Sequence, residues 1–147
     1  MHLAQLNVAK AKFSLEAPEL KDFVDNLDSV NAIAERSEGF IWRLKDESGD
    51  ATSFSVEQDP DMIVNMSVWS SVDALKNFIF RTHHRDFLKR KGEWFHRLPE
   101  DTYVLWWVEE GHRPTLDEAM ERLNHLRKRG DSPYAFTFKS NFQPDEL

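Results

Sequence analysis

The fold is decided by residues 63–95, IVNMSVWSSVDALKNFIFRTHHRDFLKRKGEWF. The first seven residues of this segment alternate in hydropathy, which predicts a β-strand with Asn65, Ser67 and Trp69 on one face. From residue 72 the apolar positions recur at helical spacing, and Ser70 with Asp73 resembles a capping box at the junction. A strand is therefore predicted to run directly into a helix.

Composition limits the classes of protein to consider. A chain of 147 residues is large enough for one domain, which we expect to span residues 1–147. The net charge of -7 argues against nucleic acid as a partner, because phosphate binding needs a surplus of Lys and Arg. The chain has no cysteine, so disulfides and thiolate chemistry are excluded. Since no apolar run could cross a bilayer and no signal peptide begins the sequence, we expect a cytoplasmic protein without a membrane partner.

The rest of the chain is predicted to supply four more strands, one of them short, and two more helices. Strands are predicted at residues 3–13, 39–44 and 102–108, and a short terminal strand at 134–138. One helix is expected between Pro18 and Gly39, and another from Leu116 to Gly130, begun by a capping box of Thr115 and Glu118. Residues 45–62 are a long polar connection, which can be a binding loop or merely mobile.

This order of elements predicts an α+β fold of the ferredoxin-like, split βαβ type. Its four-stranded antiparallel sheet has the strand order 4-1-3-2, with helices on one face and with the C-terminal helix and short strand as additions. The first and third strands lie side by side in this arrangement. Asn7 and Asn65 are therefore expected to be neighbours on the face that also carries Trp69, which we assign to the helices.

The other face of the sheet is predicted to be apolar as well. The strand at residues 102–108 is apolar on both faces, and Val64, Met66 and Val68 share the second face of the strand at residues 63–69. Because few elements remain to cover that face, we expect a second copy of the chain to cover it. The predicted assembly is a homodimer.

Several segments carry a resemblance to a known family. Residues 65–78, NMSVWSSVDALKNF, and residues 82–87, THHRDF, resemble the third strand and second helix of the dimeric α/β-barrel superfamily, which includes the antibiotic-biosynthesis monooxygenases. With HLAQLNVA, GFIWRL, LWWV and GHRPT added, nearly the whole chain resembles more closely a bacterial family of unknown function within that group. The resemblance implies a dimer whose two sheets close into a barrel, with a cavity in each subunit between sheet and helices.

The superfamily also includes haem-degrading enzymes, and the resemblance to these is partial. That branch has an Asn on the first strand, which Asn7 matches, together with a Trp and a His on the second helix. Phe78 and Leu88 stand at those two positions here. We therefore expect no haem and no other cofactor, with haem-binding monooxygenase activity as the least favoured alternative.

His83 and His84 are the first candidates for catalysis. A histidine is the usual general base near neutral pH, and either residue could take a proton from an acidic substrate. Alternatively, one histidine caps a helix end and the other is solvated. Adjacent histidines lack the spacing of two metal ligands on one helical face, so we expect no metal site.

Polar strand residues are the second group of candidates. Asn7, Asn65 and Ser67 occupy positions that an alternating strand should bury, so they either contact a ligand or satisfy one another in a structural network. Asn65 is assigned a catalytic role beside the histidines, and Asn7 and Ser67 are assigned substrate contacts. Arg43 could orient an anionic or carbonyl group, although an ion pair between subunits is the favoured interpretation.

Tryptophans are numerous for a chain of this length. Trp42, Trp69, Trp94 and Trp106 are candidate walls for a planar ligand, although large aromatic residues also form cores and dimer interfaces. Trp106 and Trp107 must face opposite ways, so one of them can line a pocket while the other packs elsewhere.

Two functions remain open from the sequence. The first is a cofactor-independent enzyme, of monooxygenase, cyclase or isomerase type, that acts on an aromatic or polyketide-like compound. In it His83 or His84 is the base, Asn7 and Asn65 hold a carbonyl or oxyanion, and tryptophans clamp the ring. The second is a non-catalytic dimeric ligand-binding or accessory protein. A wet cavity beside Asn65 favours the first, and a dry, filled space favours the second.

Overall fold

The computed structural model describes residues 1–13, 17–44, 62–81, 92–140 and 142–144. The elements of these residues are β1 (His2–Lys10), a 3-10 helix η1 (Pro18–Leu20), α1 (Lys21–Arg36), β2 (Phe40–Arg43), β3 (Met62–Trp69), α2 (Val72–Arg81), β4 (Tyr103–Val108) and α4 (Leu116–Arg129). The four strands form one antiparallel sheet in the order β2-β3-β1-β4. This is the predicted order 4-1-3-2, and the predicted α+β fold is confirmed. Predictions for residues 45–61 lie outside the described residues.

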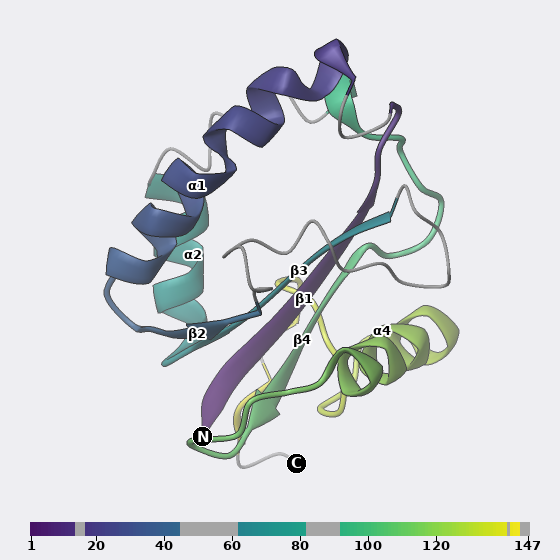
Figure 1. Cartoon of the computed structure of the whole chain (residues 1–147). Helices are drawn as coiled ribbons and strands as arrows, with labels where there is room; N and C mark the ends of the chain where they lie inside the picture. Colours follow the sequence, from purple (N-terminus) through teal and green to yellow (C-terminus); the bar gives the residue numbers. More distant parts are fainter. Residues whose placement is uncertain (14–16, 45–61, 82–91, 141, 145–147) are drawn as a thin grey trace.

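The register of the central strands also agrees with the prediction. Asn7 of β1 lies directly opposite Asn65 of β3, and Gln5 lies opposite Ser67. Alternation along both strands puts these side chains on the same face as Trp69. Figure 1 shows α1 and α2 on one side of the sheet and α4 on the other.

The face of Trp69 is the one that α1 and α2 cover. Trp69 shares an apolar cluster with Ala34 of α1 and with Leu75 and Phe78 of α2. Near the start of α1, a separate cluster contains Leu20, Ile63 and Trp94 among its members. The assignment of this face to the helices is therefore confirmed.

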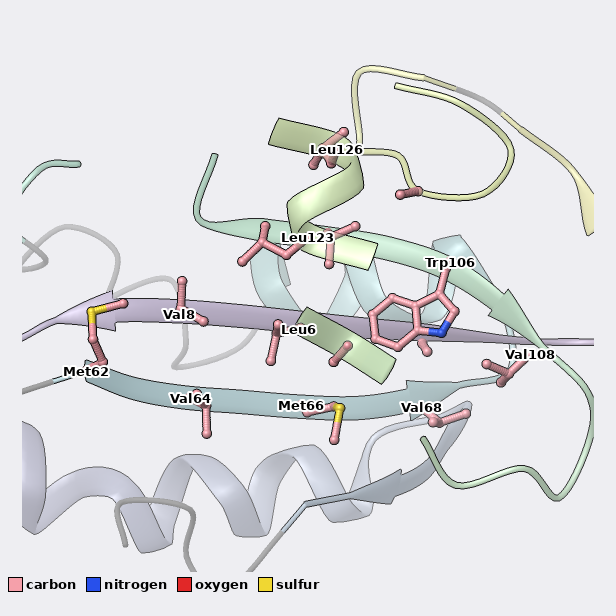
Figure 2. Packing of buried hydrophobic residues seen from close by; sticks show 14 residues of the cluster. Leu6, Val8, Met62, Val64, Met66, Val68, Trp106, Val108, Leu123 and Leu126 are labelled. Carbon is pink, nitrogen blue, oxygen red and sulfur yellow. The ribbon is translucent and has the colours of Figure 1, made fainter. Parts of the chain in front are cut away.

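The opposite face is covered by α4 of the same chain, which corrects the sequence-based assignment. Val64, Met66 and Val68 are only 1%, 1% and 2% exposed without any second subunit. They belong to one apolar cluster with Leu123 and other α4 residues, and Figure 2 shows Leu123 and Leu126 packed with this cluster. The sequence argument undercounted the elements available, because α4 supplies the layer that was assigned to a partner.

The junctions around α2 depend on a glycine and a serine. Gly39 has a φ of +85°, and a Cβ atom placed on it would lie 2.4 Å from Cβ of Ala74 in α2. Its carbonyl accepts a hydrogen bond from the backbone N–H of Ser70 at 2.7 Å. Ser71 caps α2, since its Oγ accepts from the N–H of Ala74 at 3.1 Å. The predicted cap at Ser70 is thus wrong by one residue.

The C-terminal segment follows the prediction in part. Thr115 caps α4 by accepting from the N–H of Glu118, as predicted, and α4 ends before Gly130. Instead of the short strand expected at residues 134–138, this segment forms isolated antiparallel bridges. Ala135 pairs with Ser132, and Phe136 and Leu105 exchange two backbone hydrogen bonds of 2.7 and 2.9 Å. The segment thus lies along the outer edge of β4.

Candidate functional site

On the face of the sheet that α1 and α2 cover, side chains form rows that run across the strands. The row nearest the start of β1 is aromatic and apolar, and contains Phe40, Trp69, Leu3 and Trp107. The next row is mixed, and contains Arg43, Ser67, Gln5 and Leu105. The third row contains Asn65, Asn7 and Tyr103. We call Gln5, Asn7, Asn65 and Ser67 the polar patch.

Gln5 is the centre of the hydrogen bonds in the polar patch. Its Nε2 donates to Oδ1 of Asn65 and to Oγ of Ser67, at 2.7 Å in each case. Ser67 Oγ also accepts from the indole N–H of Trp69 at 2.8 Å. Gln5 and Ser67 are buried, so these bonds offset the cost of removing their polar atoms from water, about 1–3 kcal/mol per group. Ser67 therefore belongs to a structural network.

The two asparagines of the patch are exposed, although β1 and β3 are the central strands of the sheet. The other residues of the three rows are buried or half-buried. Asn7 makes no side-chain hydrogen bond to the residues that the structure describes, and Asn65 uses only its Oδ1. Solvent therefore reaches the sheet at Asn7 and Asn65, between the cluster around Trp69 and the cluster around Ile63.

Aromatic rings flank the polar patch. Trp69 is stacked on Phe78 of α2 with ring centroids 5.2 Å apart, and meets Phe40 edge-on at 5.4 Å. Tyr103, the cross-strand neighbour of Asn7, packs on Phe138 at 5.6 Å, and its hydroxyl accepts from the Phe138 N–H at 3.2 Å. Tyr103 thus adjoins Asn7 directly, whereas the row of Ser67 and Gln5 separates Trp69 from Asn65.

A carboxylate fastens the segment that carries Phe138. Asp131 Oδ2 accepts from the N–H and the hydroxyl of Thr137, both at 2.9 Å, and from the Ser140 hydroxyl at 2.6 Å. Partial burial raises the pKa of Asp131, but these hydrogen bonds together outweigh burial, helped by the charge of Lys139, and hold the pKa below its ordinary value. The ionised form of Asp131 therefore stabilises this border of the site.

Arg43 forms an ion pair within the chain. Its Nε lies 2.7 Å from Oε1 of Glu35 in α1, and its side chain is 10% exposed. The carboxylate that pairs with Arg43 thus comes from the same chain, and the favoured pair between subunits stays a prediction. Arg43 lies opposite Ser67 in the sheet, so the pair ties the end of α1 to the β2 side of the polar patch.

Two predicted tryptophan walls lie on the wrong face. Trp42 is opposite Val68, and Trp106 is opposite Ala4, so both lie on the face that α4 covers. Trp106 is fully buried there, and its indole N–H donates to Oε2 of Glu118 at 3.0 Å. Neither residue can share a ligand with Asn7. Of the other candidates, Trp69 is 1% exposed and contacts the polar patch only through Ser67, whereas Trp94 is buried in the second cluster against Phe23.

His83 and His84, the predicted bases, lie outside the described residues, as does Leu88. Their catalytic role stays a prediction. His112, in the turn before α4, lies 2.7 Å from Oε1 of Glu118 through its Nε2. Among the described residues, no three His, Asp or Glu side chains are grouped so that they could hold a metal ion. None of the described helices is both long and apolar enough to span a bilayer.

Gln5 and Tyr103 were missed by the sequence argument. Gln5 shares the alternating face of Asn7, so its position was visible in the sequence. Its role was not, because only the strand register shows that Asn65 and Ser67 both lie within its reach. Tyr103 was counted among apolar strand residues, and its place beside Asn7 also depends on register.

An open groove on the outer surface of α4 is a weaker candidate. It is lined by residues of both charge signs, including Asp117, Glu121, Lys128 and Arg129. It lies on the element that covers the opposite face from the polar patch. Since no single charge sign or buried polar network selects a ligand there, we do not assign it a function.

Comparison with known proteins places the chain in a family. A model of a domain of unknown function, DUF3291, matches residues 2–147. The chain belongs to this family. The resemblance to a family of unknown function is thereby confirmed, and no functionally curated protein matches this DUF3291 member.

Solved structures share its fold at low sequence identity. A conserved protein from Methanosarcina mazei Go1 is 12% identical, with a TM-score of 0.56 over 74% of this chain and 94% of that one. A protein of unknown function from Nitrosomonas europaea is 12% identical, with a TM-score of 0.52 over 78% and 95%. Another from Nitrosomonas europaea, provisionally assigned as an antibiotic biosynthesis monooxygenase, is 12% identical, with a TM-score of 0.52 over 75% and 92%. The chain thus shares its fold with these proteins.

Proposed function

We propose that the protein binds an aromatic or polyketide-like small molecule on the face of its sheet that α1 and α2 cover, and transforms it without a cofactor. The reaction would be of the monooxygenase, cyclase or isomerase type. The likeness to a provisionally assigned antibiotic biosynthesis monooxygenase supports the choice of reaction class, although identity is only 12%.

The exposure of Asn7 and Asn65 is the observation that carries the proposal. A sheet under two helices normally has apolar side chains at its centre, because burial of apolar surface stabilises the packing. Here two adjacent amides meet solvent at that position, and one of them is held by a buried glutamine. Solvent exposure of Asn7 and Asn65 on this face favours an enzyme over a purely structural or accessory protein.

The chemistry of the patch suits a ligand with a carbonyl group. Two amides on directly opposite strand residues have Cβ atoms about 5 Å apart, so both can reach one oxygen atom. An amide N–H that donates to this oxygen stabilises the negative charge that develops when a neighbouring C–H is deprotonated. His83 and His84 are the proposed bases for that step, and the ring of Tyr103, the half-buried cross-strand neighbour of Asn7, would border an aromatic ligand.

We also propose that the protein is a homodimer. Its interface would lie outside the face of Val64, Met66 and Val68, because α4 already covers these residues. Light scattering coupled to size-exclusion chromatography measures the mass directly, and a monomer at all concentrations would contradict this part of the proposal.

Binding is tested with 1,8-dihydroxyanthraquinone, a planar ketone that cannot react further. We expect it to raise the melting temperature of the wild-type protein and to do so much less in Asn65→Ala. Asn124→Ala is the matched control, because it removes an exposed amide from the outer surface of α4. If the ketone does not bind the wild-type protein, the proposed ligand class is wrong.

Catalysis is tested with 1,8-dihydroxyanthrone and molecular oxygen. The ring CH2 group loses two hydrogens and gains one oxygen atom as a carbonyl, while the second oxygen atom leaves as water. The wild-type protein should accelerate oxygen uptake above the spontaneous rate, and Asn65→Ala should lose about 100-fold of that acceleration. Binding without acceleration would instead support the ligand-binding alternative.

A further inference from the structure

The buried amide of Gln5 has a restricted set of partners. An amide nitrogen carries two hydrogens, and Nε2 of Gln5 directs one to Asn65 and the other to Ser67. Gln5 belongs to β1, which lies between β3 and β4 in the sheet, and is only 9% exposed. Its side chain therefore has little freedom to turn away from these two oxygen atoms.

This arrangement sets which end of Asn65 meets solvent. The amide of Asn65 has an oxygen on one branch and a nitrogen on the other, and its Oδ1 is directed at Gln5. The Nδ2 group makes no hydrogen bond to the residues that the structure describes, and Asn65 is exposed. The patch therefore presents N–H donors at Asn65 rather than an acceptor.

Ser67 keeps Gln5 in place from the other side. Its Oγ accepts from the indole N–H of Trp69, which is 1% exposed and stacked on Phe78. The position of Oγ is thus linked to a packed aromatic core. Through Ser67 and Gln5 this core fixes the orientation of a side chain that is open to solvent.

We propose that Gln5 is a positioning residue that turns the N–H groups of Asn65 toward the ligand, so that the site selects an acceptor oxygen and disfavours an N–H donor. The inference rests on the proposed function, because it specifies the ligand chemistry of the same site. Gln5 itself does not touch the ligand. Its effect is transmitted through Asn65.

A matched pair of ligands tests the selectivity. Fluorenone and carbazole are planar tricycles of nearly the same shape, and at the same ring position fluorenone has a carbonyl acceptor where carbazole has an N–H donor. Quenching of tryptophan fluorescence gives both dissociation constants. We expect the wild-type protein to bind fluorenone about tenfold more tightly than carbazole.

Substitution of Gln5 should change this preference rather than merely weaken binding. In Gln5→Glu the carboxylate accepts hydrogen bonds only, so Asn65 turns its Nδ2 inward and presents Oδ1, and the preference should reverse in favour of carbazole. In Gln5→Met nothing orients Asn65, and the preference should fall to near unity. Asn124→Asp makes the same kind of amide-to-carboxylate change on the surface of α4 and should keep the wild-type preference.

Side-chain amide exchange tests the orientation without any ligand. In 15N-labelled wild-type protein, the Asn65 Nδ2 hydrogens should exchange with water at least about tenfold faster than the Gln5 Nε2 hydrogens. In Gln5→Glu the Asn65 hydrogens should become protected.

The outcomes separate the two proposals. If both tricycles bind and the wild-type preference persists in Gln5→Met and Gln5→Glu, the role of Gln5 is refuted while the proposed ligand class stands. If neither tricycle binds, the proposed ligand class fails, and the exchange measurement still decides the orientation. Protected Asn65 hydrogens in the wild-type protein would refute the role of Gln5.

Discussion

Gly39→Ala should destabilise the protein through a collision between the start of β2 and α2. The φ of +85° costs an L-residue about 1–2 kcal/mol. The added Cβ would also lie 2.4 Å from the Ala74 Cβ and 2.6 Å from the Ser70 Oγ, about 1 Å closer than ordinary contact. Overpacking of this kind costs about 1–3 kcal/mol. We therefore expect the free energy of unfolding to fall by about 2–5 kcal/mol in urea titrations followed by tryptophan fluorescence.

Gly111→Ala is the matched control for this prediction. Gly111 has the same φ of +85°, but an added Cβ would meet nothing within 4 Å. It should therefore show only the backbone cost of about 1–2 kcal/mol. Equal losses in the two variants would refute the close approach of Gly39 to α2, and with it the proposed placement of α2 beside the aromatic row of the site.

Two further predictions concern the layers around the sheet. Leu123→Ala should lower the free energy of unfolding by about 2–5 kcal/mol in the same titration, because Leu123 is 0% exposed under α4, and a loss near zero would contradict coverage by α4. Asp131→Asn should lower the melting temperature near neutral pH, because it removes the charge that accepts the hydrogen bonds of Thr137 and Ser140. Since folding lowers the pKa of Asp131, the stabilisation by its ionised form is present above the unfolded pKa of 3.8 and is lost as the pH falls through the folded pKa. A melting-temperature difference that stays constant to about pH 2 would show that the charge of Asp131 is not responsible.

The sheet was predictable because its signals are local and periodic. Alternation in residues 63–69, followed by a helical period from residue 72, was enough to predict a strand that leads into a helix. The strand order followed from the sequence of elements, and it placed Asn7 opposite Asn65. Thr115 was found because a capping box is a contact between residues three apart.

The layer on the second face was not predictable in this way. The apolar stripe of α4 shows that the helix is buried on one side, but not which surface it packs against. The last helix could have packed beside the other two helices or on the face of the sheet that carries Val64. Only the folded chain shows that α4 packs on β1 and β4. A partner subunit was therefore predicted to cover a surface that α4 of the same chain covers.

The candidate site was predictable as a group of residues but not as a geometry. Asn7, Asn65 and Ser67 stood out as polar residues in apolar strands. The faces of Trp42 and Trp106 depend on the registers of β2 and β4, and β2 carries an irregularity between Phe40 and Trp42. Neighbouring tryptophans therefore could not be assigned to a face from spacing alone.

The bridge between Phe136 and Leu105 also bears on how the protein avoids aggregation. A strand at the margin of a sheet offers unpaired backbone groups that can recruit another chain. The two hydrogen bonds to Phe136 occupy these groups at the middle of β4, and the aromatic residues nearby cover its flank. Deletion of the segment that follows α4 would therefore turn a well-protected margin into a template for intermolecular β-pairing.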